Sequence, residues 1–333
     1  MPGSHRTVAH SLTAGTGLMQ IIARSTGLGL TGAMAQHDPQ MVVPAGAQAL
    51  DLPIAGGRVA ALRWGRPGAR PVLAVHGWLD NAASFDFLAP LLCQAQDLDL
   101  VAIDLPGHGF SDWFADGYAP ASQAGRLLQV LDALGWPQAD LIGHSLGASL
   151  VTLLAAALPE RVRSLCCLDA LGSPAAAAVD TVPRLRRHLL AHFQSAPPAA
   201  RPIASRQRAI QARQQANGLS REAAQALINR GVRQDGTQAW WRTDPALTLP
   251  SAFYLDETQV QAVLAGIGVP ACFILASQPH PSVPGAHVHA QRQACLPATA
   301  SVQTLPGGHH LHMLTPGPVA TAVIAHLNAT ASA

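Results

Sequence analysis

Charged residues are scarce in this chain of 333 residues. They make up 12% of the sequence, which is about half of the usual share. Lysine is absent, so arginine supplies every basic side chain apart from histidine, and the net charge is only +2. Such a balance gives no sign of a nucleic-acid-binding surface. No run of about 18 apolar residues occurs, so the sequence predicts no transmembrane helix.

Cysteine is also rare, and its spacing is not typical of a bonded framework. The five cysteines include no C-x-x-C pair, and three of them lie in apolar runs, where a free thiol behaves as a small apolar side chain. The sequence therefore predicts neither a disulfide framework nor a zinc site, and we expect no metal and no organic cofactor. The five are Cys93, Cys166, Cys167, Cys272 and Cys295.

Strand-like and helix-like patterns alternate from residue 49 onward. A hairpin over residues 50–64 is followed by apolar runs, each of which leads into a helix-prone segment. This alternation predicts an α/β fold with a mostly parallel sheet and helices on both faces. It stops at Gly172, because residues 173–255 show helical patterns and no convincing strand, and it then resumes. We expect residues 41–172 and 256–333 to form the core, and residues 173–255 to form a helical cap.

Residues 1–40 lack a periodic apolar face that could join a core. Two interpretations remain, a disordered extension before Met41 or a targeting segment with a cleavage site at Ala33-Met34-Ala35. Glycines interrupt the apolar stretch within residues 1–35, so the secretory signal is weak and we expect a cytoplasmic protein. A chain that begins at Met41 should keep its activity and its melting temperature. A clear drop in melting temperature would show that the segment packs on the domain.

One stretch carries a specific chemical signal, Gly143-His144-Ser145-Leu146-Gly147. It joins an apolar strand to a helix-prone run, residues 148–158. Such a tight turn strains the backbone of Ser145 and brings the helix so close to the strand that only glycine fits at positions 143 and 147. The pattern predicts a nucleophile elbow, with the Oγ of Ser145 held at the carboxyl edge of the sheet.

Taken together, the motifs resemble the α/β-hydrolase family over residues 49–328. Within that family the chain looks most like the serine-hydrolase-like proteins, through residues 76–86, 241–245 and 308–313. The resemblance implies an α/β-hydrolase fold and a reaction type, hydrolysis by a serine nucleophile, more readily than a substrate. The motifs are His76-Gly77-Trp78, Asp104-Leu105-Pro106-Gly107-His108-Gly109, the Ser145 elbow and Gly308-His309.

A serine hydroxyl needs a base and an oxyanion hole. Among 15 histidines, His309 stands after the last apolar strand and seven residues before Pro316, the spacing of the catalytic histidine in the family. The backbone N–H groups of Trp78 and Leu146 are the expected oxyanion donors. The remaining candidates are given other roles: His76 and His108 as braces of nearby loops, and His310 and His312 as wall or surface residues.

The acid that orients His309 departs from the usual arrangement. No Asp or Glu follows Glu257, so the loop after the strand at residues 270–276 cannot supply a carboxylate. Some relatives carry the acid one strand earlier, and here that position is Asp169. A carboxylate there would fix the histidine tautomer and stabilise the imidazolium. Two alternatives stay open: Asp169 caps the start of the insertion, or the acid lies in the cap, for example at Asp244.

These assignments predict a serine hydrolase that cleaves an apolar carboxylic ester, or a thioester, through an acyl-enzyme. The partner is a small acyl substrate, and the low charge of the chain favours an apolar one. Lactones and carbon–carbon bonds are rival targets, whereas dehalogenases and epoxide hydrolases of this fold need an Asp nucleophile. From a different class, a catalytically lapsed ligand-binding protein of this fold is the alternative.

Side chains in the cap offer weaker signals. Trp240, Trp241 and Phe253 could line an acyl pocket, although an aromatic residue in a helical cap is more often packing. The basic triplet of residues 184–187, formed by Arg184, Arg186 and Arg187, is expected to be a solvated helix face rather than an anion site.

Overall fold

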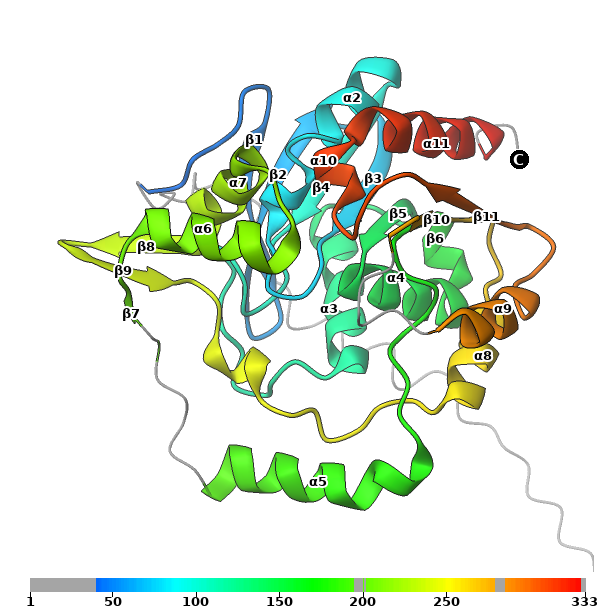
Figure 1. The fold of residues 1–333 in the computed structure, drawn as a ribbon. Coiled ribbons are helices and arrows are strands. Elements are labelled where there is room, and N and C mark those ends of the chain that lie inside the picture. Colours follow the sequence, from blue (N-terminus) through cyan, green and yellow to red (C-terminus); the bar gives the residue numbers. More distant parts are fainter. Residues whose placement is uncertain (1–39, 195–199, 201, 279–284, 331–333) are drawn as a thin grey trace, which may run out of the picture. The chain divides into compact units, whose positions relative to one another are not determined.

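The structure, a computed structural model, describes residues 40–194, 200, 202–278 and 285–330. The expectations for residues 1–39 lie outside the described residues. An eight-stranded sheet forms the core (Figure 1). Its strands are β1 (Gln48–Ile54), β2 (Gly57–Gly65), β3 (Arg70–Val75), β4 (Leu98–Ile103), β5 (Ala139–His144), β6 (Val162–Leu168), β10 (Ala271–Ala276) and β11 (Ala300–Leu305).

The sheet has the order β1-β2-β4-β3-β5-β6-β10-β11. Strand β2 runs antiparallel to both of its neighbours, β1 and β4. The other six strands of the sheet pair in parallel, namely β4, β3, β5, β6, β10 and β11. The predicted mostly parallel sheet is therefore confirmed. Because β3, β5 and β6 are adjacent, the loops that follow them meet at one edge of the sheet, which is where ligands bind in folds of this kind.

Helices cover both faces of the sheet, as predicted. On one face, α3 (Pro120–Ala133), α4 (Leu146–Ala157) and α8 (Glu257–Ala265) bury leucine and valine side chains against the strands. On the other face, α2 (Ala89–Ala95) and α11 (Pro316–Ala329) do the same. Strand β5 is buried along its whole length, because a parallel strand between two helical layers has no solvent face. The two remaining helices of the core are α9 (Ala286–Ala294) and the short α10 (Leu311–Leu314).

The helix expected at residues 84–94 is two elements. A 3₁₀ turn, η1 (Ala82–Phe85), comes first, and the side chain of Asn81 caps it by accepting from the N–H of Ala83. Helix α2 begins only at Ala89, with Pro90 in its first turn. Proline is favoured there, and it disfavours helical backbone in the residue before it.

The segment between β6 and α8 holds α5 (Thr181–Leu189), α6 (Arg206–Asn217) and α7 (Arg221–Gly231). The expectation that it contains no strand is wrong. Strands β7 (Pro202–Ile203), β8 (Val232–Asp235) and β9 (Gln238–Trp241) form a small antiparallel sheet in the order β7-β9-β8. A two-residue turn closes β8 and β9, and Gly236 adopts a φ of 56° in it, a conformation that glycine takes without a Cβ penalty.

Residue Gln40 belongs to the segment that the sequence suggested is dispensable. Its side chain exchanges two hydrogen bonds with the backbone of Gln234 in β8, at 2.6 and 2.7 Å. A chain that begins at Met41 loses this pair, so the truncation is best compared with a chain that retains Gln40. The domain boundaries themselves remain a proposal. In the described ranges, no helix combines the length and apolar character that a bilayer-spanning segment needs.

Candidate active site

The turn between β5 and α4 holds Ser145 in a strained backbone conformation, with φ 51° and ψ −113°. A side chain rarely adopts such a φ, and the strain is retained because the surroundings fix it. A Cβ at position 143 would lie 2.5 Å from the Cα of Ala148. One at position 147 would collide with the carbonyl oxygen of Val75. Both positions therefore require glycine, because neighbouring backbone atoms leave no room for a Cβ, as the sequence indicated.

Three predicted side chains meet at this edge of the sheet. The Nε2 of His309 lies 3.0 Å from the Oγ of Ser145. The Nδ1 of the same ring lies 2.6 Å from the Oδ2 of Asp169. A carboxylate can only accept, so Nδ1 carries the proton and Nε2 presents its lone pair to the serine when the ring is neutral. This is the geometry that a general base requires.

The position of Asp169 follows from strand pairing. The N–H of Ser145 donates to the carbonyl of Leu168 at 3.0 Å, so the residue after β6 stands beside the elbow. Asp169 has a φ of 50°, and its Oδ1 accepts from the N–H of Ala276 at 2.8 Å. The second carboxylate oxygen is thereby left to His309.

The alternative acid in the cap is engaged elsewhere. Asp244 accepts from the hydroxyl of Tyr118 at 2.5 Å and from the N–H of Ala246 at 2.9 Å, where it caps the 3₁₀ turn η5 (Pro245–Thr248). Burial and the hydrogen bond to Asp244 raise the pKa of Tyr118, so the phenol keeps its proton. The structure thus brings Asp169, and not Asp244, to His309.

The expected oxyanion donors lie close to the nucleophile. A Cβ at Gly77 would be 3.2 Å from the Cβ of Ser145, so the loop after β3 runs directly beside the elbow. Within the described part of the chain, the backbone N–H groups of Trp78 and Leu146 donate to no other protein group. The Leu146 N–H also opens helix α4, where the helix dipole favours negative charge.

Two buried histidines brace the loops around this edge, as expected. The Nε2 of His76 accepts from the N–H of Leu105 at 2.9 Å, and its Nδ1 donates to the carbonyl of Gly77 at 2.7 Å. The Nε2 of His108 accepts from the N–H of Leu79 at 3.2 Å. Burial lowers the pKa of His108 to about 3, so the ring stays neutral and keeps this lone pair.

The expectation that His310 and His312 are wall or surface residues is wrong, because both are buried. His310 donates from Nε2 to the Oδ2 of Asp80 at 3.1 Å. His312 shares a hydrogen bond with the hydroxyl of Ser84 at 2.6 Å. Their rings pack around His144, whose Nε2 donates to the backbone carbonyl of His309 at 2.9 Å. The hydrogen bond from His144 helps to fix the backbone of His309.

One group in the described ranges could hold a metal ion by proximity alone, namely Asp80, His144 and His310. The charge beside the group argues against a metal. Each ring donates from Nε2–H and keeps a lone pair on Nδ1, but the carboxylate already pairs with the guanidinium of Arg213 at 2.5 Å, whose positive charge would repel a cation. The residues therefore fit an ion-pair network better than a cation site.

Histidine burial implies acid sensitivity. Burial and the nearby His310 lower the pKa of His312 to about 3, whereas an unfolded histidine titrates near 6.5. Below pH ~6.5, His312 becomes protonated in the unfolded chain but stays neutral in the folded protein. The free energy of unfolding therefore decreases as the pH falls. From pH 7 to pH 5 this residue alone should cost about 2 kcal/mol of unfolding free energy.

His312→Gln should therefore make the fall in melting temperature between pH 7 and pH 5 shallower, since glutamine cannot titrate. His287→Gln, at an exposed position, is the matched control and should keep the wild-type slope. Equal slopes in His312→Gln and wild type would contradict this origin of the acid sensitivity.

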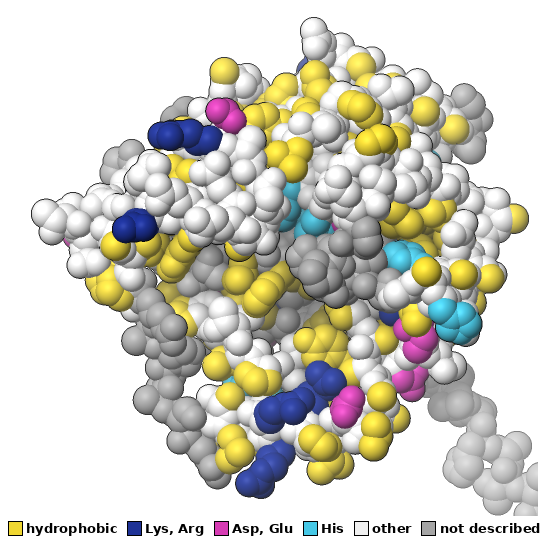
Figure 2. Space-filling view, in the orientation of Figure 1, with side chains coloured by type: hydrophobic (Ala, Val, Ile, Leu, Met, Phe, Trp, Pro, Cys, Tyr) yellow, Lys and Arg dark blue, Asp and Glu magenta, His cyan; other side chains and the backbone are white. Residues whose placement is uncertain are grey.

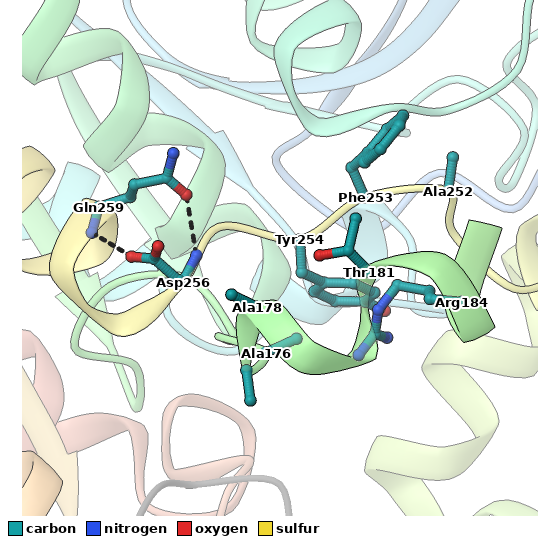
Figure 3. Close-up of a pocket in the computed structure, with 10 residues that line it drawn as sticks. Ala176, Ala178, Thr181, Arg184, Ala252, Phe253, Tyr254, Asp256 and Gln259 are labelled. Atoms are coloured by element: carbon teal, nitrogen blue, oxygen red, sulfur yellow. Dashed lines mark hydrogen bonds between the residues drawn. The ribbon is translucent and has the colours of Figure 1, made fainter.

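The cap aromatics do not gather at Ser145. Trp241 packs against the apolar core of the cap, and Trp240 lies under the guanidinium of Arg233. Phe253 lines a pocket of about 220 Å³ between α5 and the segment that returns to the core (Figure 3). Arg184 stacks on Tyr254 in the same pocket, 4.5 Å from the ring centroid. No catalytic candidate lines this pocket.

Arg186 and Arg187 are exposed, as expected of a solvated face. In the space-filling view, histidine side chains lie in the recessed centre of the visible face, next to α6, with apolar side chains beside them (Figure 2). Ser145 itself is half-buried. No signal in the sequence indicated the roles of Asp80 and Arg213, whose contacts link the loop after β3 to the cap.

Comparison with known proteins agrees with this fold. A family model described as alpha/beta hydrolase fold matches residues 70–316. The serine hydrolase-like protein of Danio rerio is 29% identical over 282 residues, which are 82% of this chain and 86% of that protein. The esterase Rv0045c of Mycobacterium tuberculosis is 36% identical over 117 residues, 35% of this chain and 38% of that protein.

Solved structures include a similar one of unassigned activity. The crystal structure of the hypothetical protein PA1622 from Pseudomonas aeruginosa PAO1 matches with a TM-score of 0.78 and 34% identity. The match covers 84% of this chain and 99% of that one.

Proposed function

Because the chain belongs to the α/β-hydrolase fold family and is close to the serine hydrolase-like proteins, we propose that it cleaves an apolar carboxylic ester, or a thioester, through an acyl-enzyme. The observation that carries this proposal is the continuous contact from Asp169 through His309 to the Oγ of Ser145. A serine is a weak nucleophile unless a base takes its proton, and here the base is in hydrogen-bond contact.

In the first half of the reaction, the Oγ of Ser145 attacks the acyl carbon while the Nε2 of His309 takes the hydroxyl proton. Asp169 holds the ring in the required tautomer and stabilises the imidazolium that forms. The carbonyl oxygen becomes an oxyanion, which accepts from the N–H groups of Trp78 and Leu146. When the bond to the leaving group breaks, the imidazolium returns its proton to the departing alkoxide or thiolate.

In the second half, a water molecule replaces the leaving group. The Nε2 of His309 takes a proton from the water, and the hydroxide equivalent attacks the acyl carbon. The ester bond to Ser145 then breaks, the serine oxygen recovers the proton, and the carboxylic acid leaves. The same two N–H donors stabilise the second oxyanion, so one site serves both steps.

Three observations support an apolar acyl group. The chain carries few charges, the recessed centre of the face in Figure 2 has apolar neighbours, and the partial relative Rv0045c is an esterase. A ligand-binding protein without catalytic activity would not need hydrogen bonds that connect Asp169, His309 and Ser145. This proposal also includes a cytoplasmic location, a small acyl partner and the predicted boundaries of the cap.

Hydrolysis of p-nitrophenyl esters of increasing acyl length tests the substrate class. We expect kcat/KM to rise by about 4-fold for each added methylene, at about 0.8 kcal/mol per buried CH₂, until the acyl site is filled. A parallel series of thioesters separates the two leaving groups. Absence of turnover on every ester and thioester would support the lapsed alternative.

A further inference from the structure

The loop that follows β3, residues 77–81, is held from the cap at several points. The indole Nε1 of Trp78 donates to the carbonyl of Leu247 in η5 at 3.2 Å. The side-chain amide of Asn81 donates to the carbonyl of Leu227 in α7 at 2.8 Å, in a buried position. Both acceptors belong to the segment between β6 and α8, so the cap contacts the loop on each side of its centre.

The centre of the loop is held by α6. One guanidinium nitrogen of Arg213, Nη2, donates to the carbonyl of Leu79 at 2.7 Å and to the Oδ1 of Asp80 at 2.5 Å. The arginine thus binds a backbone group and a side chain of adjacent residues. The two N–H bonds of this nitrogen lie in the fixed plane of the guanidinium, which sets the directions of both contacts, whereas the N–H bonds of a lysine ammonium rotate freely.

The contact with Arg213 stabilises an unfavourable backbone conformation at Leu79. Leu79 has a φ of 61°, a conformation that costs a leucine about 1–2 kcal/mol. It is held because its N–H donates to His108 and its carbonyl accepts from Arg213. Without the second contact the backbone of Leu79 can relax. Leu79 directly follows Trp78, whose N–H is an oxyanion donor in the proposed mechanism.

The carboxylate of Asp80 forms an ion pair with Arg213 and holds its guanidinium in place. Burial alone would raise the pKa of Asp80, but the charge of Arg213 and the hydrogen bond from His310 hold that pKa well below its ordinary value. Asp80 is therefore ionised, and it is almost fully buried. A buried charge that loses its partner is strongly unfavourable, which favours the docked position of α6.

We propose that Arg213 is a positioning residue that ties the cap to the oxyanion loop, so that the docked cap completes the oxyanion hole. This inference rests on the proposed acyl transfer. Arg213 does not touch the reacting atoms. It acts through Leu79 and Asp80 on the direction of the Trp78 N–H, and it links the placement of α6 to transition-state stabilisation.

Arg213→Met tests this role. We expect a 10- to 100-fold lower kcat with little change in KM, because loss of one oxyanion donor costs about 10²–10³-fold and the variant only misdirects it. The inhibition constant of a boronic acid that mimics the tetrahedral intermediate should rise by the same factor. Arg206→Met is the matched control. Arg206 lies on the same helix and donates to Val232 within the cap at 2.9 Å, so kcat and inhibitor affinity should stay at wild-type values.

Circular dichroism and melting temperature establish whether each variant folds. If Arg213→Met is unfolded, Arg213→Lys decides the matter. Lysine keeps a positive charge for Asp80 but not the planar guanidinium that directs both contacts, so it should show the same paired loss at smaller size. A folded variant with a higher KM, an unchanged kcat and an unchanged boronate affinity would overturn the positioning role. Failure of the wild type itself to bind the boronate or to cleave any ester would instead overturn the proposed function.

Discussion

Replacing Ser145 with Ala should leave the fold intact and lower kcat by about 10⁴-fold or more. Alanine removes the Oγ that hydrogen-bonds to the Nε2 of His309, and its Cβ occupies the place of the serine Cβ. The strained φ of residue 145 is no worse for alanine than for serine, so the melting temperature should change little. Steady-state turnover of an activated ester is the measurement.

Ser122→Ala is the matched control for the nucleophile. Ser122 is exposed on α3, so this variant should retain wild-type kcat. If Ser145→Ala still hydrolyses the ester at a comparable rate while folded, the reaction centre lies elsewhere in the molecule.

Asp169→Asn should keep the fold and lower kcat by about 10³–10⁴-fold. The asparagine amide can present an N–H to the Nδ1 of His309, which stabilises the tautomer that cannot accept the serine proton at Nε2. It also removes the charge that stabilises the imidazolium. KM should change little, because the 2.6 Å contact joins Asp169 to His309 rather than to substrate.

The alternative acid supplies the control for Asp169. Asp244→Asn should retain most of the turnover, because Asp244 is bonded to Tyr118 and to the first turn of η5. Near wild-type kcat for Asp169→Asn, or a larger loss for Asp244→Asn, would show that His309 works without the Asp169 carboxylate.

Local sequence signals were sufficient for the parts of the site that depend on one turn. The glycines at 143 and 147 predict the close approach of α4 to the strand before it, and the carbonyl of Val75 in β3 proves to lie as close to Gly147. Asp169 could be predicted because no carboxylate follows Glu257 and because the resemblance includes relatives that carry the acid one strand earlier. Parallel pairing then brings the ends of β5 and β6 together.

Contacts between the cap and the core could not be predicted in the same way. Arg213 and Asp80 are separated by 133 positions, and nothing in the helical pattern of residues 204–217 indicates which arginine faces the core. The burial of His310 could not be predicted either, because its partner, Asp80, lies 230 positions away. The small cap sheet did leave a signal, the Gly236-Thr237 turn with glycine first, beside strands of only four residues each.

Reaction with a fluorophosphonate probe, followed by mass spectrometry of the peptides, tests the central claim most directly. Such a probe bonds to a serine oxygen only when a base and an oxyanion hole activate it. The account predicts one adduct, on the peptide that contains Ser145, which is absent in Ser145→Ala and forms more slowly in Asp169→Asn. A folded wild-type protein that forms no adduct, or forms it at another serine, would contradict the claim that Ser145, His309 and Asp169 are a working triad.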